Sequence, residues 1–164
     1  MSLALRVALS SASILAVASV AVAQTPPLRK TDFVAIGGTS NAVTFASPQL
    51  ITRNGAVTTA TMIFVVDPPS RNGTVTASQT EWIWCADGQV QIKLQVSRDA
   101  AGKEISRQEP TSPPAKPEAG TIADKFAVFA CTGKLPDPQA ARYATIEEAI
   151  AGARAILARN RGQP

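Results

Sequence analysis

The chain has 164 residues, of which 45% are apolar and 17% charged, with a net charge of +4 at pH 7 and no histidine. This length fits one domain. The lack of imidazole excludes Ser-His-Asp and Cys-His catalytic arrangements as well as histidine metal sites. The basic residues are scattered along the sequence, so the concentrated basic stripe of a nucleic-acid-binding protein is absent from the pattern.

The first 23 residues predict a secretory signal peptide. One basic residue, Arg6, precedes a run rich in Ala, Val, Leu and Ser that ends in Ala-Val-Ala at 21–23. This order is typical of a cleavable signal, so we expect cleavage between Ala23 and Gln24. A membrane anchor is the alternative, but it needs about 20 strongly apolar residues, and serines dilute this run. We therefore expect an exported protein without a stable membrane span.

A polar linker over residues 24–31 leads into a series of strand patterns. Asn54-Gly55 separates the third pattern from the fourth and accepts the positive φ angles of a type I′ hairpin turn. The fourth pattern is long and β-branched, and it ends at Asp67-Pro68-Pro69. The strands expected up to this point cover residues 32–36, 41–45, 49–52 and 57–66.

Three further strand patterns cover residues 74–85, 89–97 and, more weakly, 103–108. In the second of them four apolar residues alternate with polar ones, which predicts that one face packs on a core and the other meets water. These apolar residues are Val90, Ile92, Leu94 and Val96. Successive strands joined by short turns favour an antiparallel meandering β-sheet of about six strands.

A loop and a short helix are expected after the strands. Residues 110–120 contain four prolines and predict an exposed loop or tether. Thr121 is a candidate N-cap for a helix over 121–130. The alternation of Phe126, Val128 and Ala130 is also compatible with a strand, but we favour the helix.

A second helix is expected near the end of the chain. Thr145 and Glu148 form a capping-box pattern. The apolar stripe that follows consists of Ile146, Ala149, Ile150, Ala153 and Leu157. We expect this stripe to dock on the sheet, and a free amphipathic helix on a membrane is the alternative. The predicted α+β chain thus has a signal peptide (1–23), a linker (24–31), a sheet domain (32–134) and a C-terminal helix with its tail (135–164).

Cys85 and Cys131 predict one disulfide. Export takes them to an oxidising compartment, where two cysteines allow a single pairing. A redox-active pair would need a C-x-x-C spacing, and two distant thiols without histidine do not complete a metal site. No metal is therefore expected.

Trp82 and Trp84 are the candidate binding patch. Side chains two residues apart in a strand share a face, and two indoles there could form a sugar platform or a protein-interaction patch. We favour packing on a core instead, although apolar Ile83 between them leaves their orientation open. The carboxylates show no paired spacing, and we expect Glu81 to be an edge charge, so no catalytic residue is predicted.

Four segments in order carry a family pattern. They are Asp-Phe-Val-Ala-Ile-Gly at 32–37, Val-Thr-Phe-Ala-Ser-Pro-Gln-Leu-Ile-Thr-Arg-Asn-Gly at 43–55, Trp-Ile-Trp-Cys at 82–85 and the helix pattern from Gly120 to Cys131. With them, the region from 32 to 131 resembles surface-adhesin protein E-like domains, which are small exported proteins of Gram-negative bacteria. Ala46 stands where that family usually has an acidic residue, and the C-terminal helix is an addition.

This resemblance implies an antiparallel sheet with a packed helix and one disulfide. The namesake of the family is an outer-membrane-associated adhesin that binds host matrix proteins and can bind haem. Because this chain has no histidine for an axial ligand, no cofactor is expected. We expect a non-catalytic binding protein of the periplasm or cell surface, with a host matrix protein or envelope component as its partner. The alternative is a periplasmic inhibitor or envelope-stress protein that uses residues 110–120 as a protruding loop.

Overall fold

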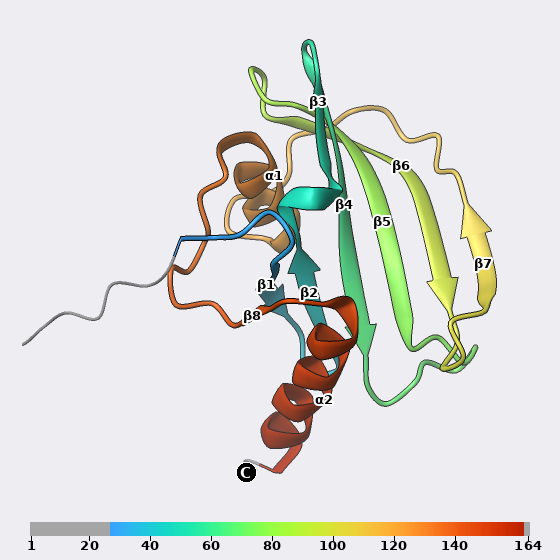
Figure 1. Ribbon diagram of the computed structural model, residues 1–164. Coiled ribbons are helices and arrows are strands. Elements are labelled where there is room, and N and C mark those ends of the chain that lie inside the picture. Colours follow the sequence, from blue (N-terminus) through green and yellow to red (C-terminus); the bar gives the residue numbers. More distant parts are fainter. Residues whose placement is uncertain (1–26, 163–164) are drawn as a thin grey trace, which may run out of the picture.

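The computed structural model describes residues 27–162, so the expected signal peptide and its cleavage site at Ala23 and Gln24 lie outside the described residues. The described chain forms eight strands and two α-helices (Figure 1). The helices are α1 (Ile122–Thr132) and α2 (Ile146–Gly162), and a 3-10 helix (Pro48–Leu50) precedes β3. The strands are β1 (Phe33–Gly38), β2 (Ala42–Ala46), β3 (Ile51–Asn54), β4 (Val57–Val66), β5 (Thr76–Trp84), β6 (Gln89–Arg98), β7 (Glu104–Gln108) and β8 (Arg142–Tyr143).

The strands form one antiparallel sheet, which confirms the α+β class; it has eight strands where about six were expected, and β4 to β7 form the meander. The strand order is β7-β6-β5-β4-β2-β1-β8, and β3 also pairs with β4. β3 lies along residues 57–60 of β4 and β2 along residues 63–66, so the two short strands follow one another on the same edge of β4. β8 has two residues and pairs with the start of β1. No sequence pattern predicted it, because two residues are too few to show a period.

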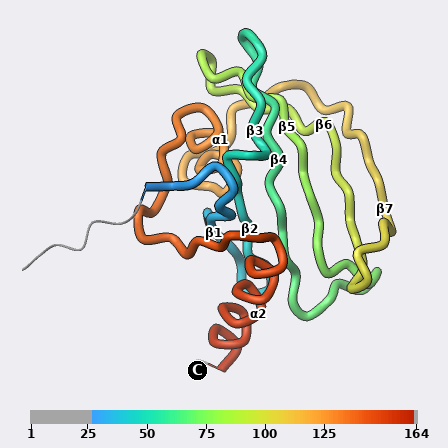
Figure 2. The backbone as a smooth tube through the Cα atoms, viewed as in Figure 1, coloured from blue at the N-terminus to red at the C-terminus, as the bar shows by residue number. Residues whose placement is uncertain are grey.

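The two helices pack on opposite faces of the sheet, and their paths can be followed in Figure 2. Two positions of β4 show the division, since Met62 belongs to the buried cluster beneath α1 and Val65 to the cluster beneath α2. Phe126 of α1 and Leu157 of α2 are fully buried in these clusters. A strand buried on both faces is apolar without alternation, which explains the uninterrupted run at residues 62–66.

Both helices begin at the predicted capping residues. The Thr121 hydroxyl accepts a hydrogen bond from the backbone N–H of Asp124 at 3.3 Å, and Thr145 accepts one from Glu148 at 3.2 Å. The Glu148 carboxylate in turn accepts from the backbone N–H of Ala144 at 2.8 Å, so the return bond of the predicted capping box reaches the residue before the cap instead of Thr145. The first segment is thus a helix rather than a strand, and the C-terminal helix packs on the sheet.

α2 approaches the sheet at a glycine. Tyr143 of β8 meets Phe45 of β2 edge to face, with ring centroids 5.8 Å apart. The Tyr143 ring also covers Gly152 so closely that a Cβ at this position would overlap it. The missing side chain therefore lets α2 lie against β8 and β2.

The predicted disulfide is present between Cys85 and Cys131, which are 46 residues apart in sequence. It joins the residue after β5 to the last turn of α1. Closing a loop of this length stabilises the folded state by about 4 kcal/mol in the chain-entropy model. The link therefore holds α1 on its face of the sheet.

The prediction that the four apolar residues of β6 share one face is wrong. Leu94 pairs with Thr80 and Ile92 pairs with Glu81, so one residue of β6, Lys93, is extra at this point. Such a β-bulge reverses the facing of the residues beyond it. Val90 packs against the cluster beneath α1, whereas the register places Leu94 on the α2 side of the sheet.

Two predicted loops are present but differ in detail from expectation. The β3–β4 hairpin is confirmed, but its turn is not type I′, because no residue other than glycine has a positive φ among residues 27–162. Gly55 at φ +58° is the first loop residue, which is the glycine position of a type II′ turn. The proline-rich segment is an exposed loop, as predicted, but it does not protrude as a free tether. Ala115 exchanges backbone hydrogen bonds of 2.8 and 3.0 Å with Val90, so the segment follows the edge of β6.

Candidate functional site

The α2 side of the sheet is covered only in part. α2 packs on β1, β2, β8 and β4, and Figure 1 shows it at the β1 and β2 end of the sheet, away from β6 and β7. The register pairs Thr59 with Trp82, Thr61 with Thr80 and Ile63 with Ser78 across β4 and β5. We define the open face as the polar and aromatic side chains of this region. They are Thr59, Thr61, Ser78, Thr80, Trp82 and Trp84.

The tryptophans lie at the end of the open face that is farthest from α2. Trp82 is 41% exposed, and its ring meets that of Trp84 at 77° with centroids 6.4 Å apart. The core packing that the sequence favoured is therefore wrong for Trp82. Ile83 decides the orientation, because it is fully buried in the cluster beneath α1 and so turns both neighbours to the opposite side.

Lys93 of β6 packs against the ring of Trp82. Its ammonium nitrogen lies 4.4 Å from the centre of the indole ring, which is a cation–π contact. The β6 bulge supplies this lysine as the extra residue of the strand. The sequence pattern gave no signal for the contact, because the expected regular alternation places Lys93 at a plain water-facing position.

A hollow of about 260 Å³ adjoins Trp82 on the opposite side from Lys93. Asn54 of β3, Val57 and Thr59 of β4, and Trp82 line it. β4 and β6 flank β5 on its two sides, so the indole stands between the lysine and the hollow. A ligand in the hollow would meet one amide, one hydroxyl and an aromatic surface.

Glu81 lies on the opposite face of β5 and is buried, so the expected edge charge is wrong. Its Oε1 accepts a hydrogen bond of 2.6 Å from Gln79, and the Gln79 carbonyl oxygen accepts one of 2.7 Å from Gln95. Oε2 has no hydrogen-bond partner among the described residues. Burial raises the pKa of Glu81 to about 7, against a smaller opposing effect of the Gln79 hydrogen bond.

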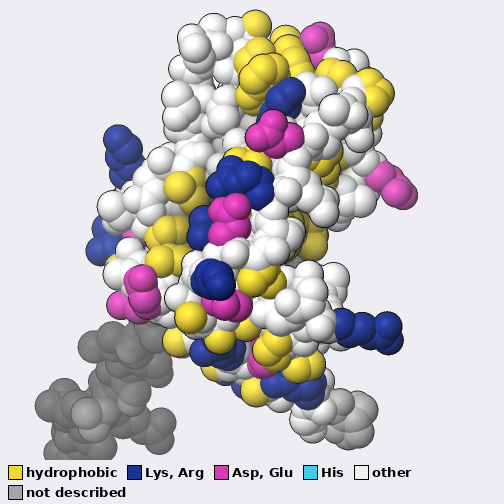
Figure 3. Space-filling view, turned by 90° about the vertical axis from the view of Figure 1, so that its right-hand side faces the viewer, with side chains coloured by type: hydrophobic (Ala, Val, Ile, Leu, Met, Phe, Trp, Pro, Cys, Tyr) yellow, Lys and Arg dark blue, Asp and Glu magenta, His cyan; other side chains and the backbone are white. Residues whose placement is uncertain are grey.

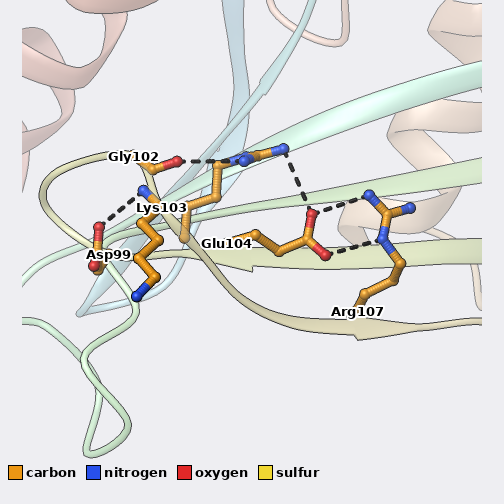
Figure 4. A network of polar contacts seen from close by, with 6 residues as sticks. Asp99, Gly102, Lys103, Glu104 and Arg107 are labelled. Atoms are coloured by element: carbon orange, nitrogen blue, oxygen red, sulfur yellow. Dashed lines mark hydrogen bonds and ion pairs between the residues drawn. The ribbon is translucent and has the colours of Figure 1, made fainter.

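Charged residues gather instead at the β7 edge of the sheet. Glu104 accepts two hydrogen bonds from Arg107, at 2.9 and 3.0 Å, and its carboxylate lies 4.0 Å from the guanidinium of Arg98 (Figure 4). Figure 3 shows basic and acidic side chains intermixed on this side of the molecule. Paired charges on an exposed edge strand oppose pairing with another chain, so this edge is a protected one.

Two larger hollows lie on the β1 and β8 side of the sheet, with volumes of about 490 and 530 Å³. Each contains one carboxylate, Asp137 in the first and Asp32 in the second. Asp32 forms an ion pair of 2.8 Å with Arg29. Neither hollow therefore brings together the two carboxylates that glycoside hydrolysis requires.

Within the described part of the chain, no helix is long and apolar enough to cross a membrane. In residues 27–162, no three His, Cys, Asp or Glu side chains come together in a group that could hold a metal ion.

Comparison with known proteins gives one structural similarity. No protein-family model matches the chain, and no curated protein matches it. Among solved structures, crystal form II of Haemophilus influenzae protein E is similar, with a TM-score of 0.47 and 13% sequence identity. The alignment covers 67% of this chain and 94% of that chain. At this level of similarity the comparison does not assign the chain to a family.

Proposed function

We propose that the chain is an exported, non-catalytic binding protein of the adhesin E-like type, and that it contacts a host matrix or envelope component through the open face. The observation that carries this proposal is the exposed Trp82 side chain on β5, whose ring makes a cation–π contact with Lys93. Exposed tryptophans on a rigid support are frequent centres of binding energy, because they bury a large area at little cost in conformational entropy.

Other features support each part of the proposal. The signal-like first 23 residues and the disulfide favour export. The resemblance of residues 32–131 to adhesin E-like domains favours binding over catalysis. The chain has no histidine, and the hollow beside Trp82 contains no carboxylate, so neither general acid–base catalysis nor a nucleophilic triad is favoured at this surface.

Binding to immobilised host matrix proteins and to isolated Gram-negative envelopes tests the proposal. The chain from residue 24 onward should bind at least one of them, and Trp82→Ala should weaken the binding at least tenfold. Val128→Ala is the matched control, because Val128 is 46% exposed on α1, on the other face of the sheet. Equal loss in both variants, or no loss with Trp82→Ala, would contradict a role of the open face.

Treatment of intact cells with an impermeant amine label tests the location. Labelling before the outer membrane is broken would favour a surface protein and a host partner. Protection of the chain until the outer membrane is broken would favour a periplasmic protein with an envelope partner. Recovery of the uncleaved chain from the cytoplasm would contradict export.

A further inference from the structure

Hydroxyl side chains form the floor of the open face. The hydroxyl oxygens of Thr61 and Thr80 are 2.9 Å apart across β4 and β5, and Thr59 lies beside Trp82 in the next pair. Ser78 continues the row toward α2. Each hydroxyl offers one donor and two acceptor positions. The row therefore keeps hydrogen-bonding capacity for a ligand that is both donor and acceptor.

Hollows lie at both ends of this floor. The first is the hollow beside Trp82, and the second, also of about 260 Å³, lies where Ile146 and Ile150 of α2 face Thr76 and Ser78 of β5. Ser78 and Trp82 are four residues apart in a strand, which corresponds to roughly 13 Å. The hollows and the floor thus form one elongated surface along β5, suited to a linear ligand.

The floor carries no charge. Glu81 is the one charged residue of β4 and β5, and it lies on the opposite face. Lys93 stands over Trp82, and Arg98 borders the second hollow, so basic groups occur only at the margins. A polyanion would need a concentrated basic surface. A protein partner with an apolar contact would leave the threonine hydroxyls desolvated and without partners, which is costly.

We infer that the open face binds a neutral glycan chain, which lies along β5 with one sugar ring against Trp82. A sugar presents C–H groups that pack on an aromatic plane and hydroxyls that match the Thr59, Thr61, Ser78 and Thr80 row. Lys93 fixes the indole from its other side. This inference rests on the proposed function, because it names the ligand class of the same surface.

An array of neutral hexasaccharides with gluco-, galacto- and manno-configured backbones tests the inference, with a heparin hexasaccharide as the anionic comparator. At least one neutral hexasaccharide should bind, and at least tenfold more tightly than its monosaccharide. Trp82→Ala should weaken this binding at least tenfold and Thr80→Val about threefold, with Val128→Ala unchanged. No binding to any neutral hexasaccharide, or tighter binding of heparin than of every neutral one, would overturn the inference.

Periodate treatment of the matrix and envelope samples separates this inference from the proposed function. Periodate cleaves the vicinal diols of sugars, so it should abolish the Trp82-dependent binding to those samples. If binding depends on Trp82 but survives periodate, the glycan inference is wrong and the proposed function stands. If the chain binds neither the samples nor the glycans, both are wrong.

Discussion

The covered and the uncovered parts of the sheet differ in what their side chains do. β2 and the second half of β4 are packed beneath both helices, and Phe45, Met62 and Val65 are at most 1% exposed. β7 has no buried residue, and β6 has one, Val96. The covered part holds the cluster beneath α2, whereas beyond α2 the same side of β4 and β5 presents hydroxyls and tryptophan. Stability and recognition therefore depend on different residues of the same strands: Met62 and Ile83 belong to the core, whereas their neighbours on the α2 side beyond the helix form the open face.

Removal of the disulfide should break this division, because Cys85 directly follows the open strand β5 and Cys131 lies in the helix that covers the core. We expect the double variant Cys85→Ser, Cys131→Ser to lose about 4 kcal/mol of the free energy of unfolding. Urea unfolding under oxidising conditions measures the loss. An unchanged melting temperature would show that the link between the two parts is dispensable.

Glu81→Gln should remove one source of pH dependence from the free energy of unfolding. Glu81 has a pKa of about 7 when folded against 4.5 for the free group. The unfolded chain therefore releases this proton first, and stability falls as the pH rises from about 4.5 to 7. The shift corresponds to about 3 kcal/mol.

Urea unfolding of both proteins at pH 4 and pH 8 measures this difference. The gain in stability of Glu81→Gln over the natural chain should be about 3 kcal/mol larger at pH 8 than at pH 4. Parallel pH profiles of the two proteins would show that Glu81 titrates as an ordinary carboxylate.

Gly152→Ala should destabilise the covered part, although alanine ordinarily favours a helix by about 1 kcal/mol. The added methyl group overlaps the Tyr143 ring, and we expect a net loss of about 1–2 kcal/mol. Gly162→Ala on the same helix is the matched control, because nothing lies within 4 Å of its added Cβ. A melting temperature that rises equally in both variants would mean that α2 does not depend on this close approach.

Thr80→Val should have the smallest effect on stability. Thr80 is only half-buried on the open face, so water can replace its contact with Thr61. We expect a change of less than about 0.5 kcal/mol in the free energy of unfolding. The same variant should weaken glycan binding about threefold. A loss above about 2 kcal/mol would show that the open face is part of the folding core.

The predictable parts of the fold depend on local signals. Thr121 and Thr145 mark helix starts because a capping hydrogen bond is made within three residues of the cap. The direction in which the β6 side chains point was not predictable in this way. A single extra residue, Lys93, places the side chains beyond it on the opposite face of the sheet. The exposed Trp82 and the buried Glu81 were missed for a related reason. A strand of mixed composition does not show which face a helix covers, and α1 settles this by packing on Ile83.

The disulfide has a consequence for proteolysis. It encloses β6, β7 and the proline-rich segment within one covalent ring, because all three lie between Cys85 and Cys131. A protease that cuts at the exposed turn around Gly102 would therefore leave two fragments that migrate as one molecule until a reductant is added. In an oxidising compartment, the cut chain would keep both ends of the ring attached to β5 and α1, so a nick in this least-covered region would not release a fragment.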